Sequence, residues 1–536
     1  MSATFVEARS IDSDWLGWLK RELAPTSARK IRTAIIVAGA VLCVIISMAL
    51  QVPQLATSAY MVFFISKESK LLTTITGAGG LIVLTIGIGA TLLLYKFTYG
   101  HPELRIPGMV IALFLGMWLS RVLVIGPLGF LLGFVVAVSQ SVGEEIPSPE
   151  LLVRGLLWLW VALAYAIAVT VALNLLFLPD TPQTAAHRPK PKSLLVADAF
   201  TNPAHVRFAL KVTLAAMFCY ILYSAIDWSG IHTAFITCTF IALESTEATL
   251  YKGTLRIVGC VIGGALALFS IVFLMPHMET IASLVVLVAC ASAIAGWVAT
   301  GSERISYAGL QIAFAFFYSV FQGYAPDTDL DNVRNRVIGI LFGLIVTGLV
   351  FQYIWPERTI DRLRDALRQA LQQLARLLEI PRPETSIETA KADAHALIAE
   401  TSRSFDQARR YSELTRFEFE NSRDGDRTSL GNLKTTLSGA ERVFSTATSL
   451  VSAYGLNGWR QLPSVAKNAE SELRNAAAKR IERAATSATA KDVDGTDLST
   501  AFARWNETMR PLQLENSRIA LISQIAAEVQ HLPCQS

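Results

Sequence analysis

The sequence predicts an all-α protein: a polytopic membrane protein of two parallel six-helix repeats, followed by a C-terminal cytoplasmic helical bundle. Three observations support this fold class. Hydrophobic residues make up 52% of the 536 residues and charged residues only 17%, and the mean hydropathy is +0.43. The apolar runs are concentrated between residues 34 and 355 and have the lengths that helices need to cross a bilayer. The third observation is that this apolar part is written twice.

The duplication starts at Arg32 and returns about 175 residues later at Arg207. Each copy opens with a basic residue and a long apolar helix, RTAIIVAGAVLCVIISMAL and then RFALKVTLAAMFCYILYSAI. A short aromatic segment follows, in which an Ala-aromatic pair and a Glu-Ser pair recur in order: Ala59-Tyr60 and Ala234-Phe235, then Glu68-Ser69 and Glu244-Ser245. Membrane proteins built from two copies of one unit commonly enclose a solute path between the copies. The duplication therefore indicates transport.

The apolar segments predict twelve spans. In the first half they lie near residues 34–51, 56–66, 73–97, 106–121, 124–141 and 153–178. In the second half they lie near residues 206–225, 231–243, 255–275, 281–299, 305–322 and 336–355. The second and eighth segments are too short to cross as straight helices, so they are either half-helices or extend into the flanking polar turns. Glycines of the third and ninth spans, Gly89 and Gly259 among them, predict close helix approach in lipid.

Loop charge predicts the orientation, because basic flanks are retained in the cytoplasm. With six spans in each half, one side receives the basic residues Lys20, Arg21, Arg29, Lys30, Arg32, Arg188, Lys190, Lys192, Arg358, Arg362 and Arg364. The other side receives the acidic residues Glu144, Glu145, Glu150, Glu279, Asp327, Asp329 and Asp331. Both termini are expected in the cytoplasm, and the two halves should enter the membrane with the same polarity. We therefore expect a cytoplasmic segment at 1–33, repeats at 34–178 and 205–356, a proline-rich cytoplasmic linker at 179–204, and a cytoplasmic helical domain at 357–536.

The two ends of the chain are polar. The first thirty residues lack a signal-peptide core, and Trp15, Leu16, Trp18, Leu19 and Leu23 share one helix face, which suits either the lipid headgroup layer or packing on the cytoplasmic domain. After Pro356, one apolar stripe is predicted on a helix, formed by Ile360, Leu363, Leu367, Leu371, Leu374 and Leu378. Similar patterns follow near residues 386–420, 430–454, 464–488 and 496–530. This region is expected to form a helical bundle that packs on itself or on another subunit, which makes a homo-oligomer the expected assembly.

A family resemblance can be named from the start ELAPTSARKIRTA, the twin six-helix units, the short second helix with its Glu-Ser pair, and the helical tail. The chain resembles the fusaric acid resistance and aromatic acid exporter family of bacterial inner-membrane proteins, over most of residues 20–360. The resemblance implies a multi-pass inner-membrane exporter of aromatic carboxylic acids and related toxic compounds. It also implies a periplasmic adaptor of the membrane-fusion type and an outer-membrane channel as partners. Longer members carry a sizeable domain between the halves, where this chain has only the linker near residues 179–204.

The power source for transport is expected to be an ion gradient, because the sequence contains no G-x-x-x-x-G-K-[ST] phosphate loop. A proton-coupled exporter needs a carboxylate that titrates within the membrane. Glu68 and Glu244 are the first candidates, since they end equivalent short helices, and Asp227 is the third. The alternative is that both glutamates lie at the cytoplasmic surface and pair with nearby basic residues: Lys67, Lys70, Lys252 or Arg256.

An aromatic acid as cargo requires a cation for its carboxylate and aromatic faces for its ring. The candidate cations are Arg121, Lys211 and Arg256. The candidate aromatic residues belong to the second and eighth spans: Tyr60, Phe63, Phe64, Phe235 and Phe240. The alternative for Lys211 is that it extends to the interface, and for Arg256 that it anchors its span to headgroups.

Several classes of protein are not expected. No Ser-His-Asp, Cys-His or two-metal arrangement can be assembled in the membrane part, so we expect neither an enzyme nor a cofactor or metal. Five of the six cysteines lie in apolar segments without zinc or disulfide spacing, and no nucleic-acid partner is indicated. Two functions remain. One is a proton-coupled exporter of aromatic or related amphipathic organic anions; the other is an anion channel or a membrane scaffold whose cytoplasmic bundle is the working part.

Overall fold

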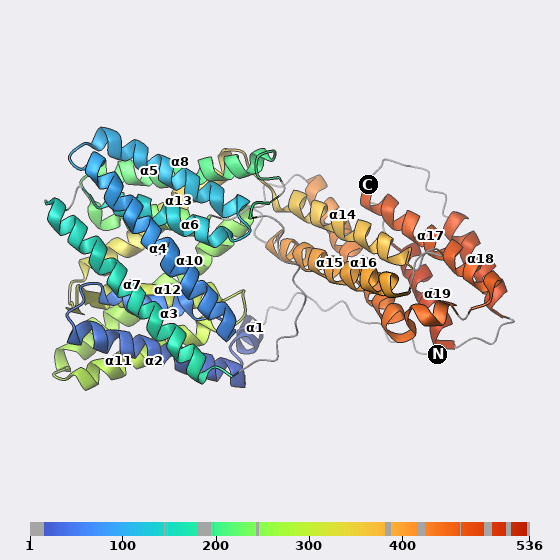
Figure 1. Cartoon of the computed structure of the whole chain (residues 1–536), viewed down its shortest axis with the longest axis horizontal. Helices are drawn as coiled ribbons and strands as arrows, with labels where there is room; N and C mark the ends of the chain where they lie inside the picture. Colours follow the sequence, from blue (N-terminus) through green and yellow to red (C-terminus); the bar gives the residue numbers. More distant parts are fainter. Residues whose placement is uncertain are drawn as a thin grey trace. The chain divides into compact units, whose positions relative to one another are not determined.

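The computed structural model describes residues 15–143, 146, 148–179, 194–196, 198–242, 246–380, 387–415, 424–460, 462–486, 496–510 and 516–532. The chain divides into two compact units (Figure 1). The first, called here the membrane unit, contains residues 1–244 and 249–356. The second, called the helical unit, contains residues 245–248 and 357–536. The described part confirms the expected all-α fold, with one small hairpin of β1 (Phe321–Gln322) and β2 (Ala325–Pro326).

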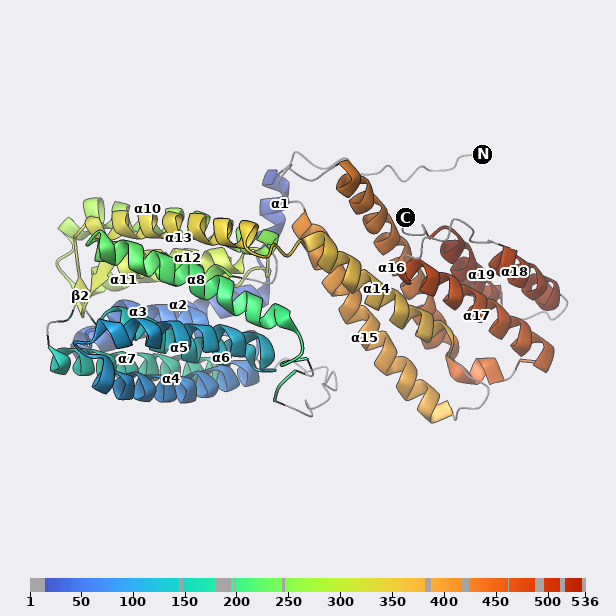
Figure 2. The same cartoon turned by 90° about the horizontal axis from the view of Figure 1, so that it is seen from above.

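The membrane unit contains thirteen described α-helices and three short helical turns. The first seven helices are α1 (Trp15–Glu22), α2 (Ser27–Ala49), α3 (Leu55–Ile65), α4 (Lys70–Thr98), α5 (Pro102–Val122), α6 (Gly126–Ser141) and α7 (Pro149–Phe177). The remaining elements are α8 (Pro203–Ala225), η1 (Ser229–Ile231), α9 (Thr233–Ile241), α10 (Thr246–Phe269), η2 (Ser270–Leu274), η3 (Met275–His277), α11 (Ile281–Ala299), α12 (Ser306–Val320) and α13 (Asp331–Tyr353). Figure 2 shows the long helices of this unit running in one general direction.

Eight of the described helices are long and apolar enough to cross a membrane: Ser27–Ala49, Lys70–Thr98, Pro102–Val122, Pro149–Phe177, Pro203–Ala225, Ala248–His277, Ile281–Ala299 and Asp331–Tyr353. Four shorter apolar helices accompany them: Leu55–Ile65, Gly126–Ser141, Ser229–Ile241 and Ser306–Val320. The second and eighth predicted spans are therefore short helices. With 11 residues, α3 is only about 16 Å long at about 1.5 Å per residue.

The sixth and eleventh predicted spans are also shorter than expected. Helix α6 begins at Gly126, with a proline in its first turn, and has 16 residues. Helix α12 has 15 residues because the chain leaves it at Phe321 and turns back through β1 and β2. An apolar run in the sequence does not reveal such a turn, so these two segments were predicted too long.

Helices α2 and α8 have the same length and the same ends. Each has 23 residues, and each begins with a side-chain cap, in which Thr26 accepts from the backbone N–H of Arg29 and Asn202 from that of Ala204. Beyond each C-terminus the chain enters the left-handed region at one residue, Gln51 in the first half and Asp227 in the second, both with φ of 53°. This conformation is uncommon for residues other than glycine.

The core of the membrane unit contains two clusters that each combine both halves of the sequence. One cluster packs α2 and α3 against α11 and α12, with Cys43, Phe63, Leu287 and Phe316 among its buried members. The other packs α8, α9 and α13 against α5 and α6, and includes Met109. The early helices of each half thus contact the later helices of the other half.

The described part of the helical unit contains six helices: α14 (Thr359–Leu378), α15 (Ile387–Leu414), α16 (Asp424–Arg460), α17 (Ser464–Thr486), α18 (Thr496–Met509) and α19 (Asn516–Gln530). The stripe predicted on α14 is buried, because Leu363, Leu367, Leu371 and Leu374 are each fully inaccessible. The segment predicted near 496–530 contains two helices, α18 and α19, with residues 511–515 outside the described part. All six helices contribute to one apolar core.

A buried carboxylate lies inside the helical unit. Glu470 on α17 has a completely buried side chain and is held between two arginines. Arg518 on α19 donates to both carboxylate oxygens at 2.9 and 3.1 Å, and Arg474 lies 2.8 Å from Oε1. Since a buried charge is tolerated only when it is paired and hydrogen-bonded, this group ties α17 to α19.

Candidate functional site

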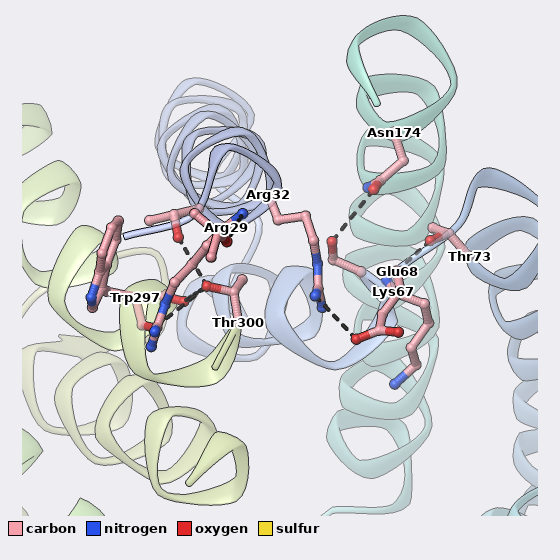
Figure 3. A network of polar contacts seen from close by, with 12 residues as sticks. Arg29, Arg32, Lys67, Glu68, Thr73, Asn174, Trp297 and Thr300 are labelled. Atoms are coloured by element: carbon pink, nitrogen blue, oxygen red, sulfur yellow. Dashed lines mark hydrogen bonds and ion pairs between the residues drawn. The ribbon is translucent and has the colours of Figure 1, made fainter. Parts of the chain in front are cut away.

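Glu68, the first coupling candidate, lies in the connection between α3 and α4 (Figure 3). Its Oε1 lies 3.3 Å from Nη1 of Arg32 on α2. The Glu68 side chain is 81% exposed and that of Arg32 is 18% exposed. The ion pair therefore lies at an accessible edge of the membrane unit, and its basic partner is Arg32, which none of the four expected pairings included.

The connection that carries Glu68 is fixed by neighbouring polar groups (Figure 3). The backbone N–H of Lys67 donates to Thr73 Oγ1 at 3.0 Å, and Ser69 caps α4 by accepting from Leu72 at 3.2 Å. The Lys67 ammonium lies 5.4 Å from the centroid of the Phe64 ring. Burial lowers the pKa of Lys67, and the nearby positive charge of Arg32 lowers the pKa further. Two positively charged side chains, Arg32 and Lys67, thus lie near the single carboxylate of Glu68 (Figure 3).

Arg29 joins the start of α2 to the end of α11 (Figure 3). Its Nε donates to the carbonyl oxygen of Trp297 at 2.9 Å, and its Nη1 donates to the carbonyl oxygens of Glu22 at 2.6 Å and Ala24 at 3.3 Å. The guanidinium also lies 4.9 Å from the centroid of the Trp297 ring. These contacts give Arg29 a structural role: its planar guanidinium holds the start of α2 to the ends of α1 and α11.

Of the other two coupling candidates, the structure describes Asp227 but not Glu244. Asp227 is exposed, and it occupies the left-handed position after α8. The backbone conformation alone explains why an aspartate stands here, since Asp and Asn enter the left-handed region more readily than most residues. Glu244 lies outside the described residues. The structure does not bring Glu68 and Asp227 together, because they follow α3 and α8 and no described ion pair or hydrogen bond joins them.

Two of the three cation candidates contact rings of the second core cluster. Lys211 on α8 is 1% exposed; its Nζ donates to the carbonyl oxygen of Trp355 at 3.2 Å and lies 4.7 Å from the Phe351 ring centroid. Arg121 at the end of α5 lies over Phe208, at 5.3 Å from the ring centroid. Both cations therefore help to hold the second core cluster together.

Arg256 on α10, the third cation candidate, is 2% exposed and lies inside the membrane unit. Its Nε donates to Thr237 Oγ1 at 3.2 Å, and its Nη1 donates to Gln311 Oε1 at 2.8 Å and to the Tyr307 hydroxyl at 3.3 Å. All three acceptors are neutral. Its second terminal nitrogen, Nη2, is buried and has no hydrogen-bond partner.

The predicted aromatic residues divide between the two core clusters. Tyr60 contacts Phe314 edge to face at a centroid distance of 5.1 Å, and Phe63 contacts Phe317 at 6.1 Å. Phe64 lies beside Lys67 instead. The remaining two belong to the other cluster, where Phe235 contacts Tyr220, and Phe240 contacts Phe130 and Phe134. Only Tyr60 shares a neighbourhood with Arg256, because both approach Phe314.

The sequence analysis missed Arg336 on α13. This residue is 8% exposed, and its guanidinium carbon lies 4.7 Å from the Phe314 ring centroid and 5.0 Å from that of Tyr318. Its Nε and Nη1 are buried and have no hydrogen-bond partner. A signal was present in the sequence: Arg336 precedes Gly339, Ile340 and Gly343 at steps of three, four and seven, which is the spacing of the buried helix face.

Together these residues form a group of two buried cations and three half-buried rings, which we call the arginine–aromatic cluster: Arg256, Arg336, Phe314, Tyr60 and Tyr318. It combines positive charge with aromatic surface, as recognition of an aromatic acid requires. The described residues contain no group of three or more His, Cys, Asp or Glu side chains that could hold a metal ion.

Comparison with known proteins gives matches to one family. The model of the fusaric acid resistance protein family matches residues 264–511, a range that contains Phe314 and Arg336. The multidrug resistance protein MdtO of Shigella flexneri is 37% identical over 207 residues, which cover 38% of this chain and 30% of the relative. MdtO of Escherichia coli (strain K12) is 36% identical over an equally long segment. The matched segment thus spans less than a third of the length of these relatives.

Proposed function

We propose that this chain, whose residues 264–511 match the model of the fusaric acid resistance protein family, is an inner-membrane efflux transporter for aromatic carboxylic acids or related amphipathic toxic compounds. The eight helices that can cross a membrane support the location, and the multidrug resistance relatives support the direction of transport. The periplasmic adaptor and outer-membrane channel are part of the proposal. So is self-association of the chain.

The observation that carries the proposal is the position of Arg256. A cation on a membrane-spanning helix is costly, and such residues usually face a protein interior and serve a substrate or ion pathway. Arg256 lies inside the unit beside the ring of Phe314, at 5.7 Å from its centroid. Anchoring to headgroups at the membrane surface would place this guanidinium at an accessible edge, as is seen for Glu68 and its partner Arg32.

We place the transport path along the seam between two parallel repeats. The matched ends of α2 and α8, with their equal φ angles at Gln51 and Asp227, support the repeat. The short helices α3 and α9 occupy equivalent places in the element order, as do α6 and α12. Since each core cluster combines helices from both halves, a shift of one half relative to the other would rearrange both clusters. Such paired rearrangement suits alternating access.

Proton coupling is assigned to the carboxylates at the ends of the short helices, Glu68 and Glu244, with Asp227 as the third candidate. The support for this assignment is the place of the two glutamates, which follow the equivalent short helices α3 and α9. We expect Glu68→Gln and Glu244→Gln each to abolish gradient-driven efflux while the protein stays folded. Normal efflux by either variant would remove that residue from the coupling role.

Vesicles that contain the full chain test the function directly. An imposed pH gradient should drive accumulation or release of 4-hydroxybenzoate, and collapse of the gradient with a protonophore should stop it. Passive, conductive flux of the same anion would instead identify an anion channel. Absence of any flux, together with unchanged sensitivity to phenolic acids in cells that lack the protein, would contradict the proposal and favour a scaffold role.

A further inference from the structure

We infer that Arg256 and Arg336 form one anion-binding site around Phe314, which takes the carboxylate group of an organic acid. The identity of the acid as an aromatic one rests on the proposed function. The anion site itself rests on the two arginines alone.

The first argument is the missing counter-charge. Both guanidiniums are nearly inaccessible, and no ion pair joins either of them to a described carboxylate. The acidic residue nearest to Arg336 in the sequence, Asp331, pairs instead with Arg334 at 3.1 Å. Buried charges in proteins are normally paired or coordinated, because removal of a charge from water is costly. Two cations around one ring, without a described counter-charge, therefore favour the binding of an anion at this place.

The second argument is the direction of the free donors on Arg256. Thr237, Tyr307 and Gln311 use Nε and Nη1, and they fix the plane of the guanidinium. Because these three acceptors are neutral, they orient the side chain without cancelling its charge. Nη2 remains as a buried donor without a partner. Gln311 is thus a positioning residue for the nitrogen that is free to bind.

The third argument is the way in which Arg336 is held. Its contacts are with the rings of Phe314 and Tyr318, which attract a guanidinium through its face. Its hydrogen-bond donors lie in the guanidinium plane, at the edge. Two of these edge donors, Nε and Nη1, are buried and have no partner. These two donors lie on different edges of the guanidinium, so a carboxylate oxygen can accept a charge-assisted hydrogen bond from one of them at a time.

The aromatic rings around the two arginines provide contacts for the ring of a bound aromatic acid. Phe314 contacts Tyr60 at 5.1 Å and Tyr318 at 4.7 Å between centroids, so three aromatic side chains gather where the two cations meet. Tyr318 is fixed by a 2.8 Å hydrogen bond between its hydroxyl and that of Thr57. An aromatic acid bound at the arginines would find its ring contacts in this group, whereas acetate would use the arginines only.

The test is direct binding to the full chain in lipid nanodiscs, measured by isothermal titration with benzoate, neutral benzamide and acetate. Benzoate should bind, and benzamide and acetate should each bind at least about tenfold more weakly, since charged hydrogen bonds and ring contacts are each worth that much. Arg256→Gln and Arg336→Gln should each weaken benzoate binding by about tenfold or more. The matched control is Arg334→Gln, an exposed arginine two residues from Arg336 on the same helix, which should bind benzoate normally.

Thermal unfolding of the same samples separates binding from folding. Without benzoate, Arg256→Gln and Arg336→Gln should keep a cooperative unfolding transition, because removal of a buried charge without a counter-charge offsets the hydrogen bonds and ring contacts that are lost. The upward shift of the unfolding temperature with benzoate should be lost. Equal benzoate binding by both variants, or equal binding of benzamide and benzoate, would overturn the anion site. Equal binding of acetate would overturn the ring contacts. If benzoate binds through both arginines but vesicles show no efflux, the proposed function fails while the site stands.

Discussion

The guanidinium carbon of Arg336 lies 4.7 Å from the centroid of the Phe314 ring, and Arg256 approaches the same ring at 5.7 Å. The three residues come from α13, α12 and α10, so no short sequence window contains them. One phenyl ring thus holds two like charges in one neighbourhood of the protein interior. The stability and orientation of α12 therefore control both cations together.

The first prediction concerns the contact between α10 and α12. A Cβ atom added at Gly259 would lie 2.5 Å from the Ala308 carbonyl oxygen and 2.6 Å from Gln311 Cβ. We expect Gly259→Ala to separate these helices, to lower stability by about 1–3 kcal/mol as for other overpacked positions, and to weaken benzoate binding because Gln311 moves. Thermal unfolding and benzoate titration in nanodiscs measure both effects.

The control for this prediction is Gly89→Ala on α4, where an added Cβ meets no atom within 4 Å. We expect that variant to unfold at or slightly above the temperature of the unsubstituted protein, because alanine favours helix more than glycine does. Equal stability of the Gly259 and Gly89 variants would contradict the importance of the close approach.

The second prediction concerns Arg29. Arg29→Lys keeps the charge but loses the planar fork that reaches the carbonyl oxygens of Trp297 and Glu22 at once. We expect faster hydrogen exchange at residues 20–26 and 297–301, measured by mass spectrometry, with a local loss of about 1–3 kcal/mol. Lys30→Arg, at the exposed neighbour, should leave exchange unchanged. Slow exchange in the Arg29 variant would show that other contacts hold these helix ends.

The third prediction concerns the buried carboxylate of the helical unit. Glu470→Gln leaves Arg474 and Arg518 without their negative partner, and removal of one member of a buried ion pair typically costs about 3–5 kcal/mol. Hydrogen exchange of α17 and α19 in the full chain should rise accordingly. Glu472→Gln is the matched control, since its exposed pair with Arg504 should be worth about 1 kcal/mol or less. Similar exchange in both variants would be evidence against the structural role of Glu470.

The fourth prediction concerns orientation in the membrane. Split fluorescent-protein tags at the two termini should both assemble with a partner fragment expressed in the cytoplasm. A cysteine at Gly323, between β1 and β2, should react with a membrane-impermeant maleimide added to the periplasmic side. Termini found on opposite sides would contradict the parallel repeat, because an even number of crossings in each half would no longer hold.

The fold class could be predicted because the apolar runs are long and regular. The stripe on α14 could be predicted for the same reason, since steps of three and four place Leu363, Leu367 and Leu371 on one face. The lengths of α6 and α12 could not be predicted from hydrophobicity. The start of α6 depends on Pro127, and the end of α12 depends on the turn at β1 and β2. Hydropathy indicates whether a segment can lie in lipid. It does not predict where the chain turns within an apolar segment.

The candidate site could be predicted only in part. Arg256 and Tyr60 were identified from residue type and position, but their common neighbour Phe314 belongs to a helix far along the chain. Arg336 was missed because it stands in the polar stretch DNVRNR, where charge is usually solvated. Its neighbour Arg334 is indeed exposed. A step of two residues turns a helix by about 200°, so adjacent arginines can face water and the interior.

In the membrane unit, the early helices of each half pack against the later helices of the other half, and this packing has a consequence for biosynthesis. Helices α2 and α3 pack against each other and against α7, but also against α11 and α12, so part of their apolar surface stays uncovered until the chain has been made as far as Val320. Insertion of the early helices and their final assembly must therefore be separate events, with the early helices waiting in lipid. If the gene were divided after residue 178, neither product would be expected to mature alone, and the two would have to be synthesised in the same cell.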